Sequence, residues 1–158
     1  MALEIERKFR LKDPAVLKDL QGKLFFQAYL AQGPLTVRVR IQEDQAMLTL
    51  KGPASNASRL ECEYPIPVAD ARQMVALKGV PSLSKTRYCI EYQGHTFEVD
   101  QYHGALDGLY TVEAERESVD EKLALPAWVG DELTGRRGWD NDMLAKMGPP
   151  EDAYLFPR

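Results

Sequence analysis

The feature of this 158-residue chain that most constrains its fold is a strict alternation of charged and apolar side chains in short segments. In the first of them, Glu4, Glu6 and Lys8 occupy every second position, and Ile5 and Arg7 lie between them. Successive side chains of a β-strand point to opposite faces of the sheet, so this spacing puts three charges on one face. The pattern therefore predicts strands that each carry a charged face.

The same alternation, followed along the chain, predicts a mainly β protein with short peripheral helices. Seven strands alternate clearly, and an eighth with weaker periodicity is expected at 24–31. The seven lie at 3–10, 36–42, 46–51, 58–66, 85–93, 95–102 and 109–116. The helical patterns lie at 13–20, 69–79 and 140–148. Hairpins are expected at 42–45 and 92–95, and because neither a repeat nor a linker divides the sequence, we expect residues 1–158 to form one domain.

The charged faces of these strands are almost purely ionisable, whereas the exposed face of an ordinary sheet usually includes Thr, Ser and Gln. An open antiparallel sheet with its polar side in water is one explanation. Like charges two residues apart repel, however, so such pairs do not favour folding unless something neutralises them. About eight strands can also close into an antiparallel barrel. If the apolar faces point outward beneath the helices, the charged faces line a polar tunnel.

The lining of such a tunnel would contain two chemically different sets of side chains. Clustered carboxylates suit Mg²⁺ or Mn²⁺, and clustered Arg and Lys suit phosphate oxygens, so a tunnel with both sets suits a metal-complexed polyphosphate. The cations are Lys8, Arg38, Arg40, Lys51, Arg59, Lys85 and Arg87. The anions are Glu4, Glu6, Glu61, Glu63, Glu98, Asp100, Glu113 and Glu115.

Composition argues against several other classes of protein. The net charge of −4 provides no general basic field for nucleic acid. No apolar run approaches the ~20 residues of a membrane span, and charges near the N-terminus interrupt any secretory signal, so we expect a cytoplasmic chain without a membrane partner. Cys62 and Cys89 lack metal-binding spacing and are expected to be small buried residues. The glycine-rich motifs of the common nucleotide-binding folds do not occur.

The motifs, in their order along the chain, resemble those of the CYTH or triphosphate tunnel metalloenzyme superfamily. Each motif is short, but their ordered occurrence over nearly the whole chain is specific. They are E-x-E-x-K (Glu4, Glu6, Lys8), R-x-R (Arg38, Arg40), T-x-K (Thr49, Lys51), R-x-E-x-E (Arg59, Glu61, Glu63), K-x-R (Lys85, Arg87), E-x-D (Glu98, Asp100) and V-E-x-E (Val112, Glu113, Glu115). The resemblance implies an eight-stranded antiparallel tunnel that binds a triphosphate with divalent cations. Small members that begin with E-I-E-R-K-F look most like inorganic tripolyphosphatases.

The resemblance also implies residue roles, with two Mg²⁺ or Mn²⁺ ions as cofactors. A first ion would bind Glu4, Glu6 and Glu115, and a second, near the attacked phosphorus, would bind Glu63, Asp100 and Glu113. The residues expected to hold phosphate oxygens are Lys8, Arg38, Arg40, Lys51, Arg59, Lys85 and Arg87. One ion would bridge phosphate oxygens, while the other would lower the pKa of an attacking water. The catalytic candidates are Lys51, Glu113 and Glu115.

Two parts of this assignment are open in the sequence. Lys51 is either a proton acceptor or orienter, if surrounding cations lower its pKa, or one more phosphate contact. Relatives tend to have a D-K-R-Y-like stretch that brings a further basic residue to the tunnel, and the corresponding run here is 135–141. Arg136 replaces the lysine and is expected to bind substrate, whereas Gly138 replaces the aromatic residue and Trp139 would supply the packing.

Several alternatives stay open. The same scaffold serves adenylate cyclases and thiamine triphosphatases, and a non-catalytic polyphosphate or nucleotide-binding module is a more distant reading. His95 and His103 are expected to have surface or local hydrogen-bonding roles, and Trp128 and Tyr29 are expected to be packing residues rather than substrate-stacking ones. The expected partner is a small-molecule triphosphate, and a homodimer is compatible with the sequence.

Overall fold

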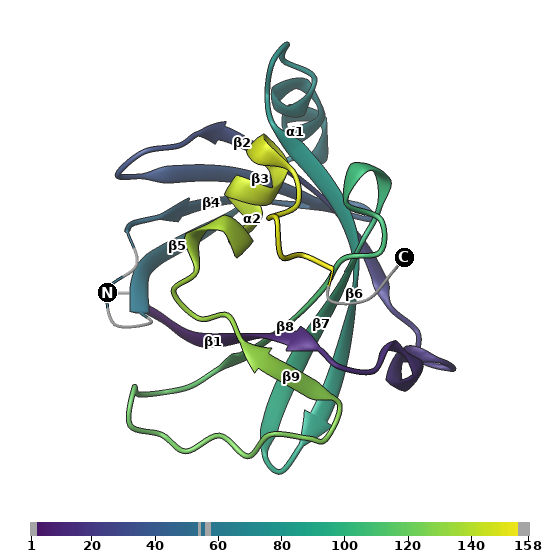
Figure 1. Cartoon of the computed structure of the whole chain (residues 1–158). Helices are drawn as coiled ribbons and strands as arrows, with labels where there is room; N and C mark the ends of the chain where they lie inside the picture. The colour runs from purple at the N-terminus through teal and green to yellow at the C-terminus, as the bar shows by residue number, and fades with distance from the viewer. Residues whose placement is uncertain (1–2, 54, 56–57, 155–158) are drawn as a thin grey trace.

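The structure, a computed structural model, describes residues 3–53, 55 and 58–154, and these residues form nine antiparallel strands (Figure 1). The strand order is β5-β4-β3-β2-β6-β7-β8-β1-β9, and pairing of β5 with β1 closes eight strands into a barrel, as predicted. The strands are β1 (Leu3–Leu11), β2 (Lys23–Ala31), β3 (Thr36–Gln42), β4 (Gln45–Lys51), β5 (Ser58–Ile66), β6 (Ser82–Tyr92), β7 (His95–Tyr102), β8 (Tyr110–Glu115) and β9 (Val129–Glu132).

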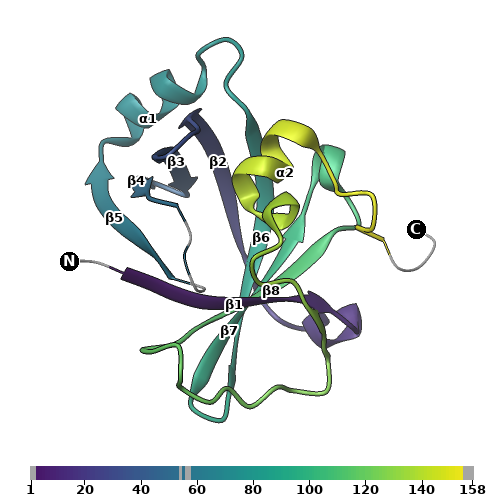
Figure 2. The same cartoon turned by 60° about the vertical axis from the view of Figure 1, so that its left-hand side comes forward.

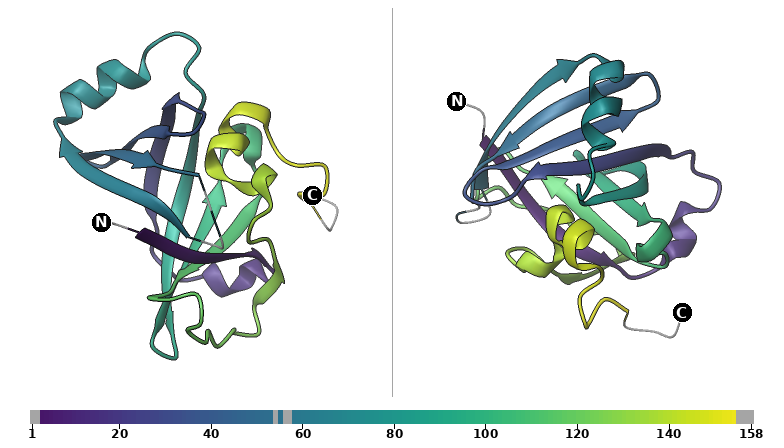
Figure 3. Two further views of the ribbon diagram at one scale, coloured as in Figure 1. Left: turned by 90° about the vertical axis from the view of Figure 1, so that its left-hand side faces the viewer. Right: turned by 90° about the horizontal axis from the view of Figure 1, so that it is seen from above.

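The hydrophobic residues surround the barrel instead of filling it. Val39 and Ala46 pack outward against Ala71 of helix α1 (Val68–Val75), which lies along the outside of the barrel (Figure 3). A second cluster, around Phe97 and Val112, packs beneath the 3₁₀ helix η1 (Pro14–Leu17) and the loop before β9. Burial of these outer faces supplies the favourable free energy of a normal core and leaves the inner faces free for charge.

A third cluster closes one end of the barrel. Leu83 and Tyr102 meet Trp139 of η3 (Arg137–Trp139) and Leu144 of helix α2 (Asn141–Met147) there. Another 3₁₀ turn, η2 (Gly104–Leu106), adds Leu106 to this cluster. Helix α2 therefore lies across this opening of the barrel (Figures 1 and 2).

Most predicted elements occur, with small shifts of their ends. Both expected hairpins are present, because Gln42 pairs with Gln45 and Tyr92 with His95. The helix expected at 13–20 is only the 3₁₀ turn η1. Strand β9 was missed, because it has four residues without alternation.

Individual packing predictions have different outcomes. His95 Nε2 lies 2.7 Å from Glu121 Oε1 and His103 Nε2 lies 2.7 Å from Thr86 Oγ1, so both histidines have the expected local hydrogen bonds. Trp128 packs edge-to-face on Phe97, with 5.7 Å between ring centroids. None of the helices in the described part of the chain is long and apolar enough to cross a membrane.

The prediction that both cysteines are buried is wrong. Both are free thiols; Cys89 is exposed and Cys62 is only partly buried. Cys89 follows Arg87 by two positions on the inner face of β6, toward the end of the strand away from α2. Cys62 lies on the outer face of β5, whereas α1 packs on β2, β3 and β4.

Candidate functional site

The charged faces of the strands point into the barrel and enclose a cavity of about 160 Å³, here called the interior cavity. Asn141 is the one uncharged residue in its lining within the described part of the chain. The charged lining residues are Glu4, Glu6, Arg38, Arg40, Lys51, Glu61, Glu63, Arg87, Glu98, Glu113 and Glu115. All of these were expected to face inward, so the alternation of the strands predicted the lining.

A second cavity of about 420 Å³, here called the vestibule, lies where β1 and the start of β5 meet the segment 133–140. It shares Glu4 and Glu6 with the interior cavity. Its other lining residues are Lys8, Gly33, Thr36, Pro53, Ser55, Ser58, Arg59, Leu133, Thr134, Gly135, Arg137 and Asp140. Because the two spaces share carboxylates, a ligand in the interior cavity could extend into the vestibule.

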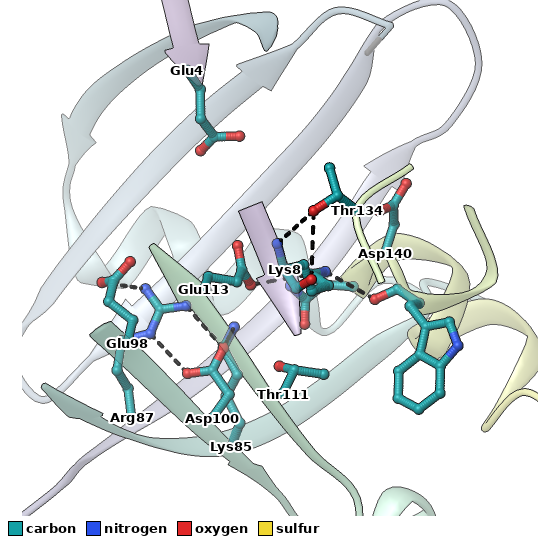
Figure 4. Close-up of polar contacts among 12 residues, drawn as sticks. Glu4, Lys8, Lys85, Arg87, Glu98, Asp100, Thr111, Glu113, Thr134 and Asp140 are labelled. Atoms are coloured by element: carbon teal, nitrogen blue, oxygen red, sulfur yellow. Dashed lines mark hydrogen bonds and ion pairs between the residues drawn. The ribbon is translucent and has the colours of Figure 1, made fainter. Parts of the chain in front are cut away.

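Lys85 and Asp100 form a buried ion pair in the wall of the barrel, with Nζ and Oδ2 2.7 Å apart. Arg87 donates to both oxygens of Asp100, at 2.8 and 2.9 Å, and to Glu98 at 3.0 Å (Figure 4). Burial, aided by Arg87 and Arg40, lowers the pKa of Lys85 to about 7. Although burial alone would raise it, the charges of Arg87 and Lys85 bring the pKa of Asp100 below its ordinary value.

This arrangement alters the role expected of Asp100. Both of its oxygens accept hydrogen bonds from cations, so Asp100 would have to share or give up these contacts in order to bind a metal ion. Its carboxylate fixes Lys85 and Arg87, which repel each other, in one place. The spacing of E-x-D in the sequence does not reveal these contacts, because they join different strands.

The other inward carboxylates form hydrogen-bonded pairs, Glu4 with Glu61 and Glu6 with Glu113. Burial, together with Glu61, raises the pKa of Glu4 to about 7, and burial and Glu113 raise the pKa of Glu6 well above its ordinary value. Two neighbouring carboxylates repel each other when both are ionised, which favours protonation of one member of each pair. Glu113 Oε1 is buried, 3.8 Å from Lys8 Nζ, and has no hydrogen-bond partner among the described residues.

This donor set fits a hard divalent cation. Carboxylate oxygens are the ligands that Mg²⁺ and Mn²⁺ prefer, and a bound cation would favour the ionised form of these carboxylates and give the unpartnered Glu113 oxygen a partner. Glu115 lies in the same lining, and burial together with Glu98 raises its pKa. Within the described ranges, no three His, Cys, Asp or Glu side chains are already close enough together to hold an ion. Side-chain rotation within the cavity would have to complete such a site.

Lys51 lies between two carboxylates, with Nζ 3.2 Å from Glu4 Oε1 and 3.0 Å from Glu61 Oε2. Burial by itself would lower the pKa of Lys51. The nearby negative charges, that of Glu4 most of all, nevertheless raise this pKa above its ordinary value. The expectation that neighbouring cations lower this pKa is therefore wrong for the protein without a ligand. The lysine with a lowered pKa is Lys85.

Three further cations, Arg38, Lys8 and Arg59, belong to the linings of the two cavities. Arg38 is buried and donates to Thr49 Oγ1 at 3.1 Å, but its Nε has no partner among the described residues. Lys8 Nζ donates to the carbonyl oxygen of Trp139 at 2.9 Å, and Arg59 Nε donates to a backbone carbonyl at 2.9 Å. Lys8 and Arg59 line the vestibule, and Arg38 lines the interior cavity. Cations therefore occur in the walls of both cavities.

The inner face of β2 contributes residues to the site that the sequence pattern did not predict. The Phe25 ring lies between two guanidinium groups, 4.7 Å from that of Arg40 and 5.2 Å from that of Arg87. Gln27 accepts from Arg40 Nε at 2.8 Å and donates to the hydroxyl of Tyr29 at 3.0 Å. Tyr29, expected only to pack, lines a space of about 40 Å³ beside the interior cavity. Because apolar residues occur on both faces of β2, periodicity did not distinguish its inner side.

Arg136 does not reach either cavity, contrary to expectation. Its guanidinium is ion-paired with Asp152, which also binds Arg10. Trp139, buried in the third hydrophobic cluster beneath the Arg10 guanidinium, supplies the expected aromatic packing. Arg137, which follows Arg136 in the chain, lines the vestibule and is ion-paired with Asp142 of α2.

Known proteins resemble this chain in both sequence and fold. An inorganic triphosphatase of Acetivibrio thermocellus is 36% identical over 148 residues, which cover 92% of this chain and 95% of that protein. One from Nitrosomonas europaea is 33% identical over 153 residues, covering 92% and 99%. The crystal structure of the inorganic triphosphatase NE1496 matches with a TM-score of 0.63 at 31% identity, over 89% of this chain and 96% of that one. The CYTH domain model matches residues 2–137, and the chain therefore belongs to the CYTH domain family.

Proposed function

We propose that this protein hydrolyses inorganic tripolyphosphate to pyrophosphate and phosphate with a divalent cation as cofactor. The observation that carries the proposal is the interior cavity, where four Arg or Lys residues and seven carboxylates share one lining. An excess of carboxylates would repel a polyanion by itself, so the lining suits a phosphate chain only together with metal cations. Relatives named inorganic triphosphatase support this substrate class. The proposal takes residues 1–158 as one domain.

The cations of the wall would bind and orient the phosphate chain. Arg38, with its unpartnered Nε, would donate to phosphate oxygens, and Arg40 and Arg87 would do so from either side of Phe25. Lys85, although expected to hold phosphate oxygens, is fully buried and lines neither cavity, so it would act by holding Asp100, which in turn holds Arg87. Holding the chain in line with an attacking water supplies most of what hydrolysis of a terminal phosphoryl group requires.

Lys51 would act as a donor in this arrangement. Since its pKa is raised beside Glu4 and Glu61, it is protonated near neutral pH. A protonated lysine cannot accept the proton of the attacking water. It can, however, orient that water or stabilise negative charge on the terminal phosphate.

Divalent cations would be held by the carboxylates that face the cavity. Glu4, Glu6 and Glu115 form one candidate group, and Glu63 and Glu113 form the other. Bound Mg²⁺ or Mn²⁺ would neutralise these carboxylates, polarise phosphate oxygens and increase the acidity of a water molecule. Glu113 and Glu115 are therefore catalytic candidates through the ions that they would hold.

The vestibule favours an organic triphosphate as a second candidate substrate. Its volume of about 420 Å³ and its shared carboxylates would let the phosphates enter the interior cavity while a nucleoside or thiamine group stays outside. Thiamine triphosphate hydrolysis and cyclisation of ATP are the corresponding activities. A binding module without catalysis is less consistent with the lining, because anion binding alone would not need so many carboxylates.

The decisive experiment is to incubate the purified protein with tripolyphosphate, ATP or thiamine triphosphate, each with Mg²⁺ or Mn²⁺, and identify the products. Tripolyphosphate should give equal amounts of phosphate and pyrophosphate. Cyclic AMP with pyrophosphate would indicate a cyclase, whereas binding of tripolyphosphate without turnover would indicate a binding module.

A further inference from the structure

Asn141 differs from every other residue that lines the interior cavity in the described part of the chain, because its side chain is neutral. It is the first residue of α2 and also lines the narrow space beside Tyr29. A neutral side chain among so many charges contributes nothing to charge balance. What its amide can contribute to the cavity is hydrogen bonds.

One half of that amide already has a partner. The hydroxyl of Tyr102 donates to Asn141 Oδ1 at 2.6 Å, and Thr111 Oγ1 lies 3.2 Å from the same hydroxyl. Tyr102 and Thr111 are both fully buried, and burial raises the pKa of Tyr102 well above its ordinary value, so the hydroxyl keeps its proton. These contacts fix the orientation of the amide, with its oxygen turned toward the barrel wall.

The other half, the Nδ2 group, makes no hydrogen bond to any of the described residues, and Asn141 lines the interior cavity. Because Tyr102 holds Oδ1 toward the barrel wall, the Nδ2 donor is the part of the Asn141 amide that remains for a ligand in the cavity. Donors suit an anion, and they do not suit a metal ion. The Tyr102 ring also lies 5.7 Å from Lys85 Nζ, so the same tyrosine contacts a cation of the site.

We propose that Asn141 is a further substrate-binding residue, whose Nδ2 group donates a hydrogen bond to a phosphate oxygen of the bound triphosphate. Tyr102 is a positioning residue that acts through Asn141. The inference rests on the proposed triphosphate hydrolysis and adds a contact from α2, the helix that lies across the barrel opening. A neutral donor of this kind binds the phosphate chain without competing with the carboxylates for the metal.

The test compares Asn141→Ala, Asn141→Asp and Tyr102→Phe, with Lys146→Ala on the exposed side of α2 as a matched control. The readouts are kcat and KM for tripolyphosphate with Mg²⁺, and the calorimetric Kd of a nitrogen-bridged tripolyphosphate analogue with Mg²⁺. Asn141→Ala should raise KM and Kd about ten- to a hundred-fold, the range for losing a hydrogen bond to a charged group, with a smaller change in kcat. Asn141→Asp should weaken binding more, because it puts an acceptor where the phosphate needs a donor.

The double variant tests the positioning role. Tyr102→Phe alone should raise KM and Kd by a smaller factor, and it should have no further effect on either value in the Asn141→Ala background. A purely structural role for Tyr102 would lower the Tm and leave the two effects independent. Lys146→Ala should match the unsubstituted protein.

The outcomes separate this inference from the proposed function. If the unsubstituted protein binds the analogue but does not hydrolyse tripolyphosphate, the proposed activity fails while the Asn141 contact can still be measured from Kd. If it hydrolyses tripolyphosphate and Asn141→Ala leaves KM and Kd unchanged, the Asn141 contact is overturned. Should Asn141→Ala fail to fold, an unchanged KM and Kd for Tyr102→Phe would overturn the inference instead.

Discussion

The ammonium group of Lys85 lies 2.7 Å from the carboxylate of Asp100, and neither side chain is more than 1% exposed. Removing one member of a buried ion pair leaves the other charge without compensation, which commonly costs 3–5 kcal/mol. In this site Arg87 would lose its partner as well, since it donates to both oxygens of Asp100. Asp100 therefore has a structural task, whether or not it also binds a metal ion.

Asp100→Asn should reduce the free energy of unfolding by about 3 kcal/mol. This is the low end of the range for a broken buried pair, because Lys85, whose pKa is lowered to about 7, can release its proton. Chemical denaturation would measure the change, with Glu98→Gln as the control, since Glu98 contacts Arg87 from a more exposed position. A variant with unchanged stability but weaker Mg²⁺ binding would show instead that Asp100 is a metal ligand.

Catalysis should depend strictly on divalent cations. Seven carboxylates line the interior cavity and would repel a polyphosphate without them. Phosphate release from tripolyphosphate should stop in a chelator and return with Mg²⁺ or Mn²⁺. Full turnover in the chelator would rule out the metal-dependent mechanism.

Individual carboxylates can be tested with isosteric amides. Glu6→Gln and Glu115→Gln should each weaken metal binding and reduce turnover by at least about ten-fold. Glu132→Gln is the matched control, since Glu132 binds Arg7 outside the barrel. If Glu6→Gln and Glu115→Gln kept full activity at limiting metal, the carboxylates would have no part in binding the ion.

Neighbouring residues of β3 should have opposite effects. Arg38 faces the cavity and Val39 is fully buried beneath α1. Arg38→Ala should therefore cost little stability but impair hydrolysis and reduce the rise in Tm that tripolyphosphate and metal produce. Val39→Ala should cost about 1–3 kcal/mol with hydrolysis retained in the folded protein. The reverse pattern, measured by thermal unfolding and phosphate release, would mean that the inner and outer faces are assigned the wrong way round.

Phe25 should matter for substrate affinity although it has no polar group. Phe25→Leu keeps an apolar side chain but removes the ring between Arg40 and Arg87, a contact worth about 0.5–2 kcal/mol for each guanidinium. We expect KM for tripolyphosphate to rise several-fold as both guanidinium groups become less well fixed. Phe26→Leu, on the outer face of the same strand, should leave KM unchanged. Equal KM values for the two variants would exclude a positioning role for the Phe25 ring.

The sequence predicted those parts of the site that depend on local periodicity. Alternation alone placed Glu4, Arg38 and Glu113 on inner faces, because strand geometry fixes the side of every second residue. It could not identify Phe25 or Gln27, since β2 is largely apolar on both faces.

Contacts between strands lie beyond local periodicity altogether. The pKa of Lys51 depends on its partners Glu4 and Glu61, which only the strand register brings together. The position of Arg136 depends in the same way on its distant partner Asp152. Errors of this kind arise wherever a property depends on residues that are remote in the chain.

The three hydrophobic clusters lie around the barrel and at one end, so the residues that form them are largely different from those that line the interior cavity. Most substitutions reduce stability, and the stability threshold limits which of them survive. Here a substitution in the cavity lining, away from the buried cluster of Lys85, Arg87 and Asp100, leaves the packing of the outer faces in place. Such a barrel is well suited to evolutionary diversification, since new specificities can arise in its lining before any compensating change in the core is needed.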